Sequence, residues 1–316
     1  MLLFLLKRLG LALVSVWAVC TLTFFIAASA PGDPALIAAG EKATPAAIAI
    51  ARHDLGLDKP VLTRYGLYLA GVAHGDLGRS FRPDREPVAH FLKRGLPNTT
   101  LLAVSAILLA LVVGILTGLA AALRPNSILD RLLMTSVLLG VTLPNFVLAP
   151  VLILVFVLQL GWLPPPAQDN LWTITPDHLV LPAIVLAARP AALIARMTRA
   201  SMLETLRQDY VRTARAKGLS PATVLFKHAL KNAFLPVLTT AGVSFGYLLS
   251  GSFVVETVFT IPGVGAASIT SLADRDYSVI EGTTLLLAVI FVGINLLTDL
   301  AYAFLDPRVK AIEGPG

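Results

Sequence analysis

The chain has 316 residues, of which 56% are apolar and only 14% are charged. Soluble domains have about 25% charged residues, so this chain has too little charge to cover the surface of a soluble protein. Its formal net charge of +6 does not indicate nucleic-acid binding, because the basic residues are spread along the chain. The single cysteine, Cys20, excludes a disulfide framework and a cysteine-based metal site. We therefore expect a membrane protein with neither a nucleic-acid partner nor a metal site.

Six segments reach or approach the length of about 18 apolar residues that marks a membrane-spanning helix. They predict an all-α polytopic fold, with one transmembrane domain over residues 1–316. The predicted spans are residues 9–30, 99–123, 132–158, 179–198, 233–256 and 283–305. The fourth span requires that a charged residue, Arg189, be accommodated inside it.

The first apolar stretch has two interpretations. Lys7 and Arg8 precede it and the run Ala28-Ser29-Ala30 ends it, as in a cleaved signal peptide. The apolar region of a signal peptide usually has about 7–15 residues, whereas residues 9–30 are 22 uncharged residues. We therefore expect a helix that is retained.

Basic residues indicate the orientation, because short cytoplasmic loops are enriched in Lys and Arg. With both termini in the cytoplasm, the cytoplasmic segments carry Lys7, Arg8, Arg124, Arg131, Arg308, Lys310 and eight further basic residues between positions 196 and 231. The external loop 160–177 has no Lys or Arg, and loop 259–282 has only Arg275. Residues 31–98 also contain basic residues, but this segment exceeds the roughly 60 residues to which the rule applies.

The external segment, residues 31–98, is expected to form two short amphipathic helices and a loop on the outer face of the membrane. Thr44-Pro45 and Asp58-Lys59-Pro60 are typical helix starts, with a capping side chain just before proline.

Prolines interrupt the predicted spans at Pro144, Pro150, Pro182, Pro190 and Pro236. Irregular backbone at membrane depth is tolerated only where protein or a water-filled cavity satisfies it, so these positions indicate an internal cavity or path. Pairs of glycines four residues apart, which permit close packing of helices, occur at Gly114/Gly118 and Gly242/Gly246.

Residues 200–232 predict a helix–turn–helix in the cytoplasm. Gly218 is a natural helix stop, and Ser220-Pro221 is a typical start for the next helix. Ala214, Ala216 and Gly218 are expected to form a compact small-residue face on which another protein docks. The alternative is a solvated basic loop with no docking role.

This segment resembles the cytoplasmic coupling ("EAA") loop of ABC importer permeases. The run Tyr210-Val-Arg-Thr-Ala-Arg-Ala-Lys-Gly-Leu219 is similar to the family pattern Glu-Ala-Ala-x-x-x-Gly, with Arg212, Thr213, Ala214 and Gly218 at the matching positions. Leu230-Lys231 stands where the pattern has Leu-Pro. These departures are typical of the dipeptide/oligopeptide/nickel branch.

Other motifs resemble the first permease type of that branch. They are Pro31-Gly-Asp-Pro34, Leu55-Gly-Leu-Asp58, Gly75-Asp-Leu-Gly-Arg-Ser80, Val255-Glu-Thr-Val-Phe259, Pro262-Gly-Val-Gly265, Asp276-Tyr277 and Asp306-Pro-Arg308. Ser278 departs from this pattern, because proline often follows the Asp-Tyr pair in the family.

The resemblance implies a multi-pass subunit of an ATP-driven importer in the bacterial inner membrane. It implies four partners besides the lipid: a second homologous permease, two cytoplasmic ATPases and an external substrate-binding protein. This chain has no G-x-x-x-x-G-K-[ST] phosphate loop, so ATP and Mg²⁺ are expected on the ATPases, with no cofactor and no catalytic residue here. Peptides are the expected cargo, with nickel or another small solute as the alternative. The residues that the resemblance assigns to ATPase coupling are Tyr210, Arg212, Thr213, Ala214, Ala216, Gly218 and Leu219.

Three polar residues within or beside the spans are candidates for the translocation path. Arg189 either marks a functional site or extends its side chain to the inner interface. Glu256 either lines the external mouth or is an interfacial carboxylate. Asn145 either binds a passing peptide backbone or fills the gap left by the kink at Pro144.

Two other functions are disfavoured by the sequence. Gly242-Val-Ser-Phe-Gly246 fits the G-x-S-x-G pattern of serine hydrolases, but no histidine falls within a span to activate the serine. An ion-coupled secondary transporter often has inverted repeats and ionisable residues at mid-membrane, and neither is evident here.

Overall fold

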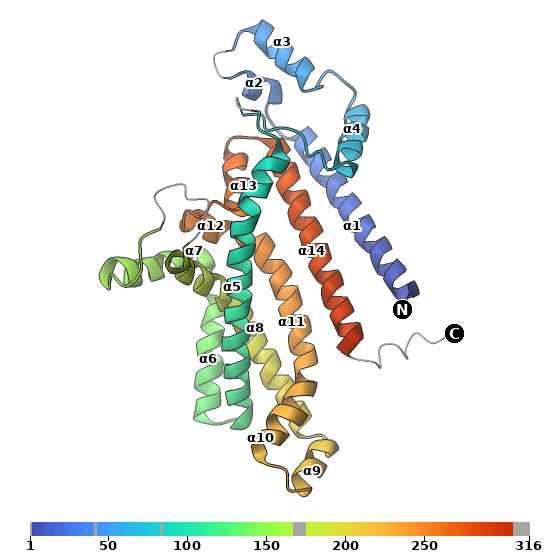
Figure 1. Cartoon of the computed structure of the whole chain (residues 1–316). Coiled ribbons are helices and arrows are strands. Elements are labelled where there is room, and N and C mark those ends of the chain that lie inside the picture. Colours follow the sequence, from blue (N-terminus) through green and yellow to red (C-terminus); the bar gives the residue numbers. More distant parts are fainter. Residues whose placement is uncertain (1, 41–42, 83–84, 167–174, 306–316) are drawn as a thin grey trace.

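The computed structural model describes residues 2–40, 43–82, 85–166 and 175–305 (Figure 1). These residues form helices and loops, with one isolated β-bridge between Arg79 and Pro87. Five described helices are long and apolar enough to cross a membrane, and a bent helix pair makes a sixth crossing if it counts as one span. The prediction of an all-α polytopic fold is confirmed. Arg308 and Lys310, used above for the orientation, lie outside the described residues.

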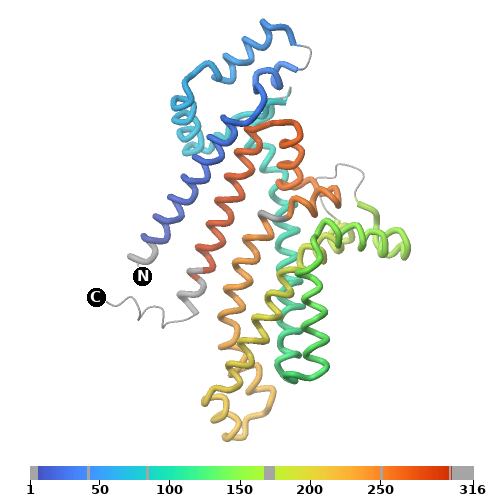
Figure 2. The backbone as a smooth tube through the Cα atoms, turned by 180° about the vertical axis from the view of Figure 1, so that it is seen from behind, coloured from blue at the N-terminus to red at the C-terminus, as the bar shows by residue number. Residues whose placement is uncertain are grey.

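The long helices form an elongated bundle (Figures 1 and 2). Helices α5 (Val88–Leu123), α8 (Pro176–Leu206) and α11 (Lys231–Gly251) pack against one another in its centre. Helix α1 (Leu2–Ser29) lies along α14 (Tyr277–Leu305) at one side, where most of its surface is exposed. A long exposed apolar helix of this kind is stable only in lipid or against another apolar surface.

The two ends of the bundle differ in structure. One end carries the short helices α9 (Asp209–Ala216) and α10 (Pro221–Thr223), and the start of α1 and the finish of α14 point towards it (Figure 1). We call it the inner end and the opposite one the outer end, after the orientation that the charges predict. The outer end carries α12 (Phe253–Val258) and α13 (Val264–Ala273). The ends of the first and last spans thus lie on the same side of the bundle, as expected for an even number of crossings.

The outer segment contains three helices rather than the two that were predicted. They are α2 (Pro34–Ala39), α3 (Pro45–Asp54) and α4 (Val61–Ala73). Thr44 caps α3 as predicted, because its side chain accepts a hydrogen bond from the Ala47 amide at 3.3 Å. Asp58 does not cap α4, since its carboxylate lies 3.0 Å from His53 Nδ1 instead. The following long helix, α5, begins at Val88, ahead of the expected residue 99.

The third predicted span, residues 132–158, does not cross the bundle as a straight helix. Helix α6 (Ile128–Thr142) is followed after a bend of 106° by α7 (Asn145–Leu152) and the π-helical turn η1 (Ile153–Gln159), which extend sideways from the bundle. The bend lies at Leu143 and Pro144. Proline disfavours helical backbone in the residue before it, and Leu143 adopts an extended conformation with ψ 118°.

Glycines make the central helix contacts close, as their spacing predicted. A Cβ on Gly114 would lie 2.7 Å from Ile194 Cγ2 and 2.8 Å from the Ala191 carbonyl oxygen, both on α8. A Cβ on Gly246 of α11 would lie 2.8 Å from the ring of Phe291 on α14. Contacts of this length leave no room for a methyl group, so glycine sets the spacing of α5 against α8 and of α11 against α14.

We predict that Gly114→Ala lowers the free energy of unfolding by about 1–3 kcal/mol through overpacking against α8. The matched control is Gly293→Ala on α14, where an added Cβ meets no atom within 4 Å. Both changes add the helix propensity of alanine, so their difference isolates the clash. The measurement is thermal unfolding of the purified chain in detergent. Equal stability of the two variants would contradict the close packing described here.

Candidate functional site

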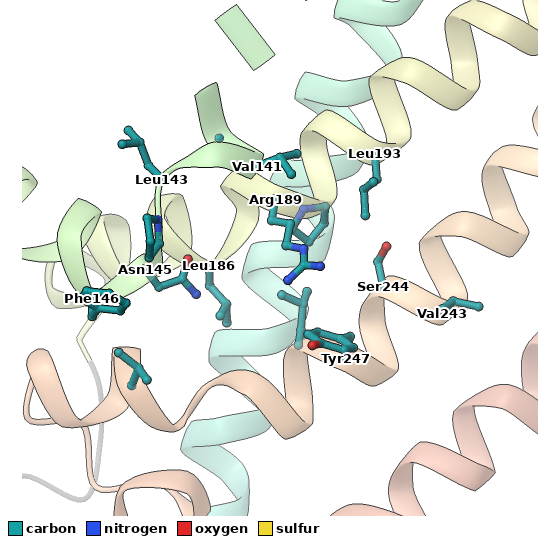
Figure 3. A pocket seen from close by; sticks show the side chains of 15 residues that line it. Val141, Leu143, Asn145, Phe146, Leu186, Arg189, Leu193, Val243, Ser244 and Tyr247 are labelled. Atoms are coloured by element: carbon teal, nitrogen blue, oxygen red, sulfur yellow. The ribbon is translucent and has the colours of Figure 1, made fainter. Parts of the chain in front are cut away.

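A chamber of about 310 Å³ lies beside the bend between α6 and α7, where these helices meet α8 and α11 (Figure 3). Its polar lining consists of Asn145, Arg189, Ser244 and Tyr247. The other lining residues are apolar or glycine, so the chamber is an apolar space with four polar side chains at its wall. Arg189 and Asn145, two of the three predicted path residues, are therefore brought together by the structure, and Glu256 is not among the lining residues.

Prolines shape this chamber. Pro144 begins the change of direction between α6 and α7, which opens the space. Pro190 lies within α8 and has no amide hydrogen, so the carbonyl of Leu186 has no helical donor four residues later. Both prolines and Leu186 line the chamber. Two of the five predicted interruptions, Pro144 and Pro190, thus lie at this cavity, whereas Pro150, Pro182 and Pro236 do not line it.

Arg189 projects from α8 towards Tyr247 on α11 (Figure 3). Its guanidinium carbon is 5.3 Å from the centroid of the Tyr247 ring, a distance at which a cation is attracted to an aromatic face. Among the described residues, no carboxylate lies within ion-pair distance of Arg189. Tyr247 was missed at the sequence level, although it directly follows the glycine of the Gly242–Gly246 motif.

The side chain of Asn145 is half-buried at the start of α7 and makes no hydrogen bond to any described residue. Both interpretations of Asn145, as a ligand for a peptide backbone and as a residue that fills the gap left by the kink at Pro144, stay predictions. Ser244 lies on the chamber wall, and the lining residues that the structure describes include no histidine. The small residues of the serine-hydrolase pattern serve packing, since Gly242 and Gly246 contact α14.

Glu256 is neither at an external mouth nor at an interface, which corrects both predictions for it. Its side chain is fully buried at the outer end, with 0% exposure. Oε1 accepts hydrogen bonds from the hydroxyls of Thr99 (2.8 Å) and Ser252 (2.7 Å), and Oε2 accepts one from the Ala266 amide (2.9 Å). The Thr99 hydroxyl in turn accepts from the Val264 amide at 2.9 Å. We call these five residues the outer clasp.

The outer clasp holds the loop 259–263 and the start of α13 against α5. The Asn98 amide adds a hydrogen bond to the Pro262 carbonyl at 2.9 Å. A Cβ on Gly265 would lie 2.9 Å from Glu256 Oε2, so this glycine is needed for the approach of the backbone to the carboxylate. Sequence reasoning did not detect the clasp because its donors come from three separate places, namely α5, Ser252 before α12, and the start of α13.

We predict that Glu256→Ala lowers the free energy of unfolding, because three buried donors lose their acceptor at about 1–3 kcal/mol each. Glu256→Gln should cost less, since its amide oxygen can still accept the Ala266 hydrogen bond. The control is Glu204→Ala, a solvent-exposed glutamate on α8. Chemical denaturation in detergent measures the three variants. A Glu256→Ala protein as stable as Glu204→Ala would show that the clasp is not structural.

The inner end forms the predicted helix–turn–helix. Helix α8 ends at Leu206, and α9 follows after a short turn. Gly218 has φ +73°, the left-handed conformation expected of a helix stop. Ser220 caps the next helix by accepting a hydrogen bond from the Thr223 amide at 3.3 Å. This helix continues through the π-helical turn η2 (Val224–Leu230) into α11.

The small residues of the loop do not form one docking face, which corrects the prediction. Ala214 is buried with Val211 and Val224, so it holds α9 against η2. Ala216 and Gly218 are exposed. The physical reason is helical geometry, because residues 214 and 216 point to different sides of α9.

The exposed surface of the loop is aromatic and basic instead. Tyr210, Leu219 and Phe226 are 42%, 40% and 57% exposed, and Arg212 and Thr213 are also exposed. The Tyr210 hydroxyl accepts a hydrogen bond from the Asn232 side chain at 2.8 Å, which ties α9 to the start of α11. Phe226 was missed at the sequence level, although a phenylalanine within a basic loop is a signal for a protein contact.

A partly buried ion pair joins two helices of the bundle near the loop. The guanidinium of Arg199 donates two hydrogen bonds of 2.7 Å to the carboxylate of Asp130, which is 3% exposed. This bidentate pair joins α8 to α6 just before α8 leads into the loop. In the sequence analysis, Arg199 was used only as one of the basic residues that indicate the orientation.

Comparisons with known proteins agree with this architecture. Residues 114–311 match the family described as the binding-protein-dependent transport system inner membrane component. Residues 1–103 match the N-terminal model of the same transport components. The chain belongs to this family. The permease is thus a multi-pass protein of the bacterial inner membrane, and the predicted resemblance to ABC importer permeases is confirmed.

Related proteins match the permease over nearly its whole length. The di/tripeptide transport system permease protein DppB of Pseudomonas aeruginosa is 42% identical over 98% of this chain and 99% of its own. The dipeptide transport system permease protein DppB of Bacillus subtilis is 41% identical, over 97% of each chain. The glutathione transport system permease protein GsiC of Escherichia coli is 40% identical over 98% of this chain and 99% of its own. Because these relatives are permease proteins, the prediction of a transport subunit rather than an enzyme is also confirmed.

A solved structure shows the same fold at lower identity. The MetNI methionine ABC transporter, in an inward-facing conformation, matches with a TM-score of 0.57 and 20% identity. The match covers 68% of the permease and 96% of the MetNI chain. The bundle described above is therefore an ABC transporter fold.

Proposed function

We propose that this permease forms one half of the translocation path of a peptide importer. The observation that carries the proposal is an open chamber with an arginine that has no carboxylate partner among the described residues, in a chain that matches peptide permeases over nearly its whole length. The relatives named above carry di- and tripeptides, dipeptides and glutathione, which is itself a tripeptide. Peptides are the cargo that these names support, and nickel or another small solute is the alternative.

A second homologous permease completes the path in this proposal. Phe146, Val243 and Tyr247 on the chamber wall are 64%, 52% and 60% exposed, and Arg189 is exposed beside them. A charged side chain that faced lipid at this depth would cost about 2.5–3.5 kcal/mol or more. This surface therefore fits a protein partner and a water-filled path better than it fits lipid.

The orientation follows from the charges. The inner end, with α9 and the Arg124–Arg131 turn, faces the cytoplasm, and the outer segment faces a substrate-binding protein. Two cytoplasmic ATPases bind ATP and Mg²⁺ and contact the exposed surface around Tyr210, Leu219 and Phe226. The permease itself holds no cofactor in this mechanism.

Cysteine accessibility tests the orientation. In a Cys20→Ala background, Ile50→Cys places a thiol on α3, at a position that is 63% exposed. Lys217→Cys places one on the exposed inner loop. In right-side-out membrane vesicles we expect a membrane-impermeant thiol reagent to label residue 50 at once and residue 217 only after permeabilisation. The reverse pattern would require the opposite orientation.

Coupling depends on the inner loop, because its two ends continue into helices that line the chamber. Helix α8 carries Arg189 and leads into α9, and η2 leads into α11, which carries Tyr247. A movement of the ATPases that displaces the loop therefore acts on both chamber walls. We propose alternating access by this route, with Tyr210, Arg212, Thr213, Ala214, Ala216, Gly218 and Leu219 as the coupling residues, and with Phe226 added from the structure.

We predict that Gly218→Leu uncouples the importer without unfolding the permease. An added Cβ meets no atom within 4 Å, so the bulk faces outwards, where the partner docks. The left-handed backbone adds a cost of about 1–2 kcal/mol, comparable to a coupling free energy of about 1–3 kcal/mol. In the reconstituted complex, the ATP hydrolysis stimulated by loaded binding protein and the uptake should fall together, by about fivefold or more.

Two control variants separate docking from backbone strain. Gly218→Asn keeps a residue that tolerates the left-handed conformation and should retain most of the stimulation. Gly161→Leu adds the same bulk at a glycine with φ +61° and open space, away from the loop, and should remain coupled. If Gly218→Leu keeps wild-type stimulation and uptake, the loop does not transmit the ATPase movement.

A further inference from the structure

Two of the three arginines of helix α8 have opposite environments. Arg199, near its inner end, is held by two hydrogen bonds of 2.7 Å to Asp130. Arg189 lies in the chamber, where its guanidinium contacts the ring of Tyr247. The first arginine is therefore neutralised within the fold, whereas the second has no carboxylate partner among the described residues.

The contact with Tyr247 leaves the hydrogen-bonding edge of Arg189 available. The guanidinium carbon lies over the Tyr247 ring at 5.3 Å from its centroid, and the five N–H donors of a guanidinium point outwards within its own plane. These donors match the two oxygens of a carboxylate in a bidentate geometry.

The rest of the chamber wall favours an anionic group of small size. Apart from Arg189, the described lining residues are neutral, and the amide of Asn145 adds a donor that is free of other partners in the described chain. A volume of about 310 Å³ is near the lower limit of ligand sites, about 300–1,000 Å³, and suits the end of a peptide rather than its full length.

We propose that Arg189, whose guanidinium lies over the Tyr247 ring, is a carboxylate-binding site in the path and holds the C-terminal carboxylate of a peptide in transit. This inference rests on the proposed peptide import. A carboxylate that enters an apolar chamber without a partner loses its hydration at a large cost. Arg189 offsets this cost for a peptide that ends in a free acid, and has no such effect on a peptide that ends in a neutral amide.

The test compares two cargoes in the complete reconstituted importer. Radiolabelled alanyl-phenylalanine and its C-terminal amide are supplied at concentrations that saturate the binding protein, and the initial rates of ATP-driven uptake are measured. Arg189→Gln should slow the uptake of the free acid at least tenfold, which corresponds to about 1.4 kcal/mol, and change that of the amide less than twofold. The same binding protein is used with every permease variant. Its own preference for the acid or the amide therefore cancels when the effect of Arg189→Gln on acid uptake is divided by its effect on amide uptake.

Further variants identify the charge as the cause. Arg189→Lys should restore part of the uptake rate of the free acid. The lysine ammonium keeps the positive charge but lacks the planar pair of N–H donors that binds both carboxylate oxygens. Arg196→Gln removes an exposed arginine from the same helix outside the chamber lining and should leave both rates unchanged. As a measurement without binding protein, the free acid should raise the melting temperature of the wild-type complex and not that of Arg189→Gln.

The outcomes separate this inference from the proposed function. If neither peptide is taken up by the wild-type importer, peptide import itself is wrong. If uptake occurs but Arg189→Gln slows acid and amide equally, or the acid shifts both melting temperatures alike, Arg189 is not a carboxylate site. Loss of the second permease from the purified Arg189→Gln complex would also overturn the inference, because it would make Arg189 an interface residue.

Discussion

Every backbone polar group at membrane depth needs a hydrogen-bond partner, which the protein itself usually supplies. The arrangement of this permease follows from the places where regular helical hydrogen bonding is interrupted. The central helices satisfy this need by regular hydrogen bonding, and the contact of Gly114 with α8 packs them without space for water. At Pro144 and Pro190 the regular pattern is interrupted, and both residues line the same chamber. The prolines therefore place a polar opening inside an apolar bundle, and that opening is where Arg189 and Asn145 can exist without facing lipid.

Helix α8 connects this opening to the loop that we assign to coupling. Its middle carries Arg189, and its inner part is fixed to α6 by the pair of Arg199 with Asp130 before the chain enters α9. Because the ion pair is bidentate and largely buried, α6 and α8 move together at the inner end, and a displacement of the loop acts on the pair of helices. The outer clasp around Glu256 has the corresponding role at the opposite end, where it fixes the loop before α13 to α5.

Much of the fold could be predicted because its signals are local. The length of the apolar stretches predicted the spans, Ser220 before Pro221 predicted the start of α10, and Gly218 predicted the turn. The structure contains each of these features. The 106° bend after α6 could not be read from Pro144 alone, since many prolines only kink a helix, as Pro190 does within the continuous α8. The position of Glu256 depends on its hydrogen bond with Thr99, which lies 157 residues away along the chain, and a single sequence does not reveal this contact. Ala214 was assigned to an exposed face because spacing gives the side of a helix but not which neighbour covers it.

Arg189 and Arg199 of α8 show how the same residue type acquires different roles through its surroundings. Arg199 has a carboxylate within the chain, so its charge stabilises one arrangement of helices and is not available to a ligand. Arg189 has an aromatic ring as its neighbour, and a ring attracts the cation without cancelling its charge. A path that carries many different peptides cannot depend on their side chains, whereas each unmodified linear peptide ends in the same carboxylate. A single unpaired guanidinium in an apolar chamber is sufficient to recognise that common group, and binding it at one point leaves the rest of the cargo free to vary.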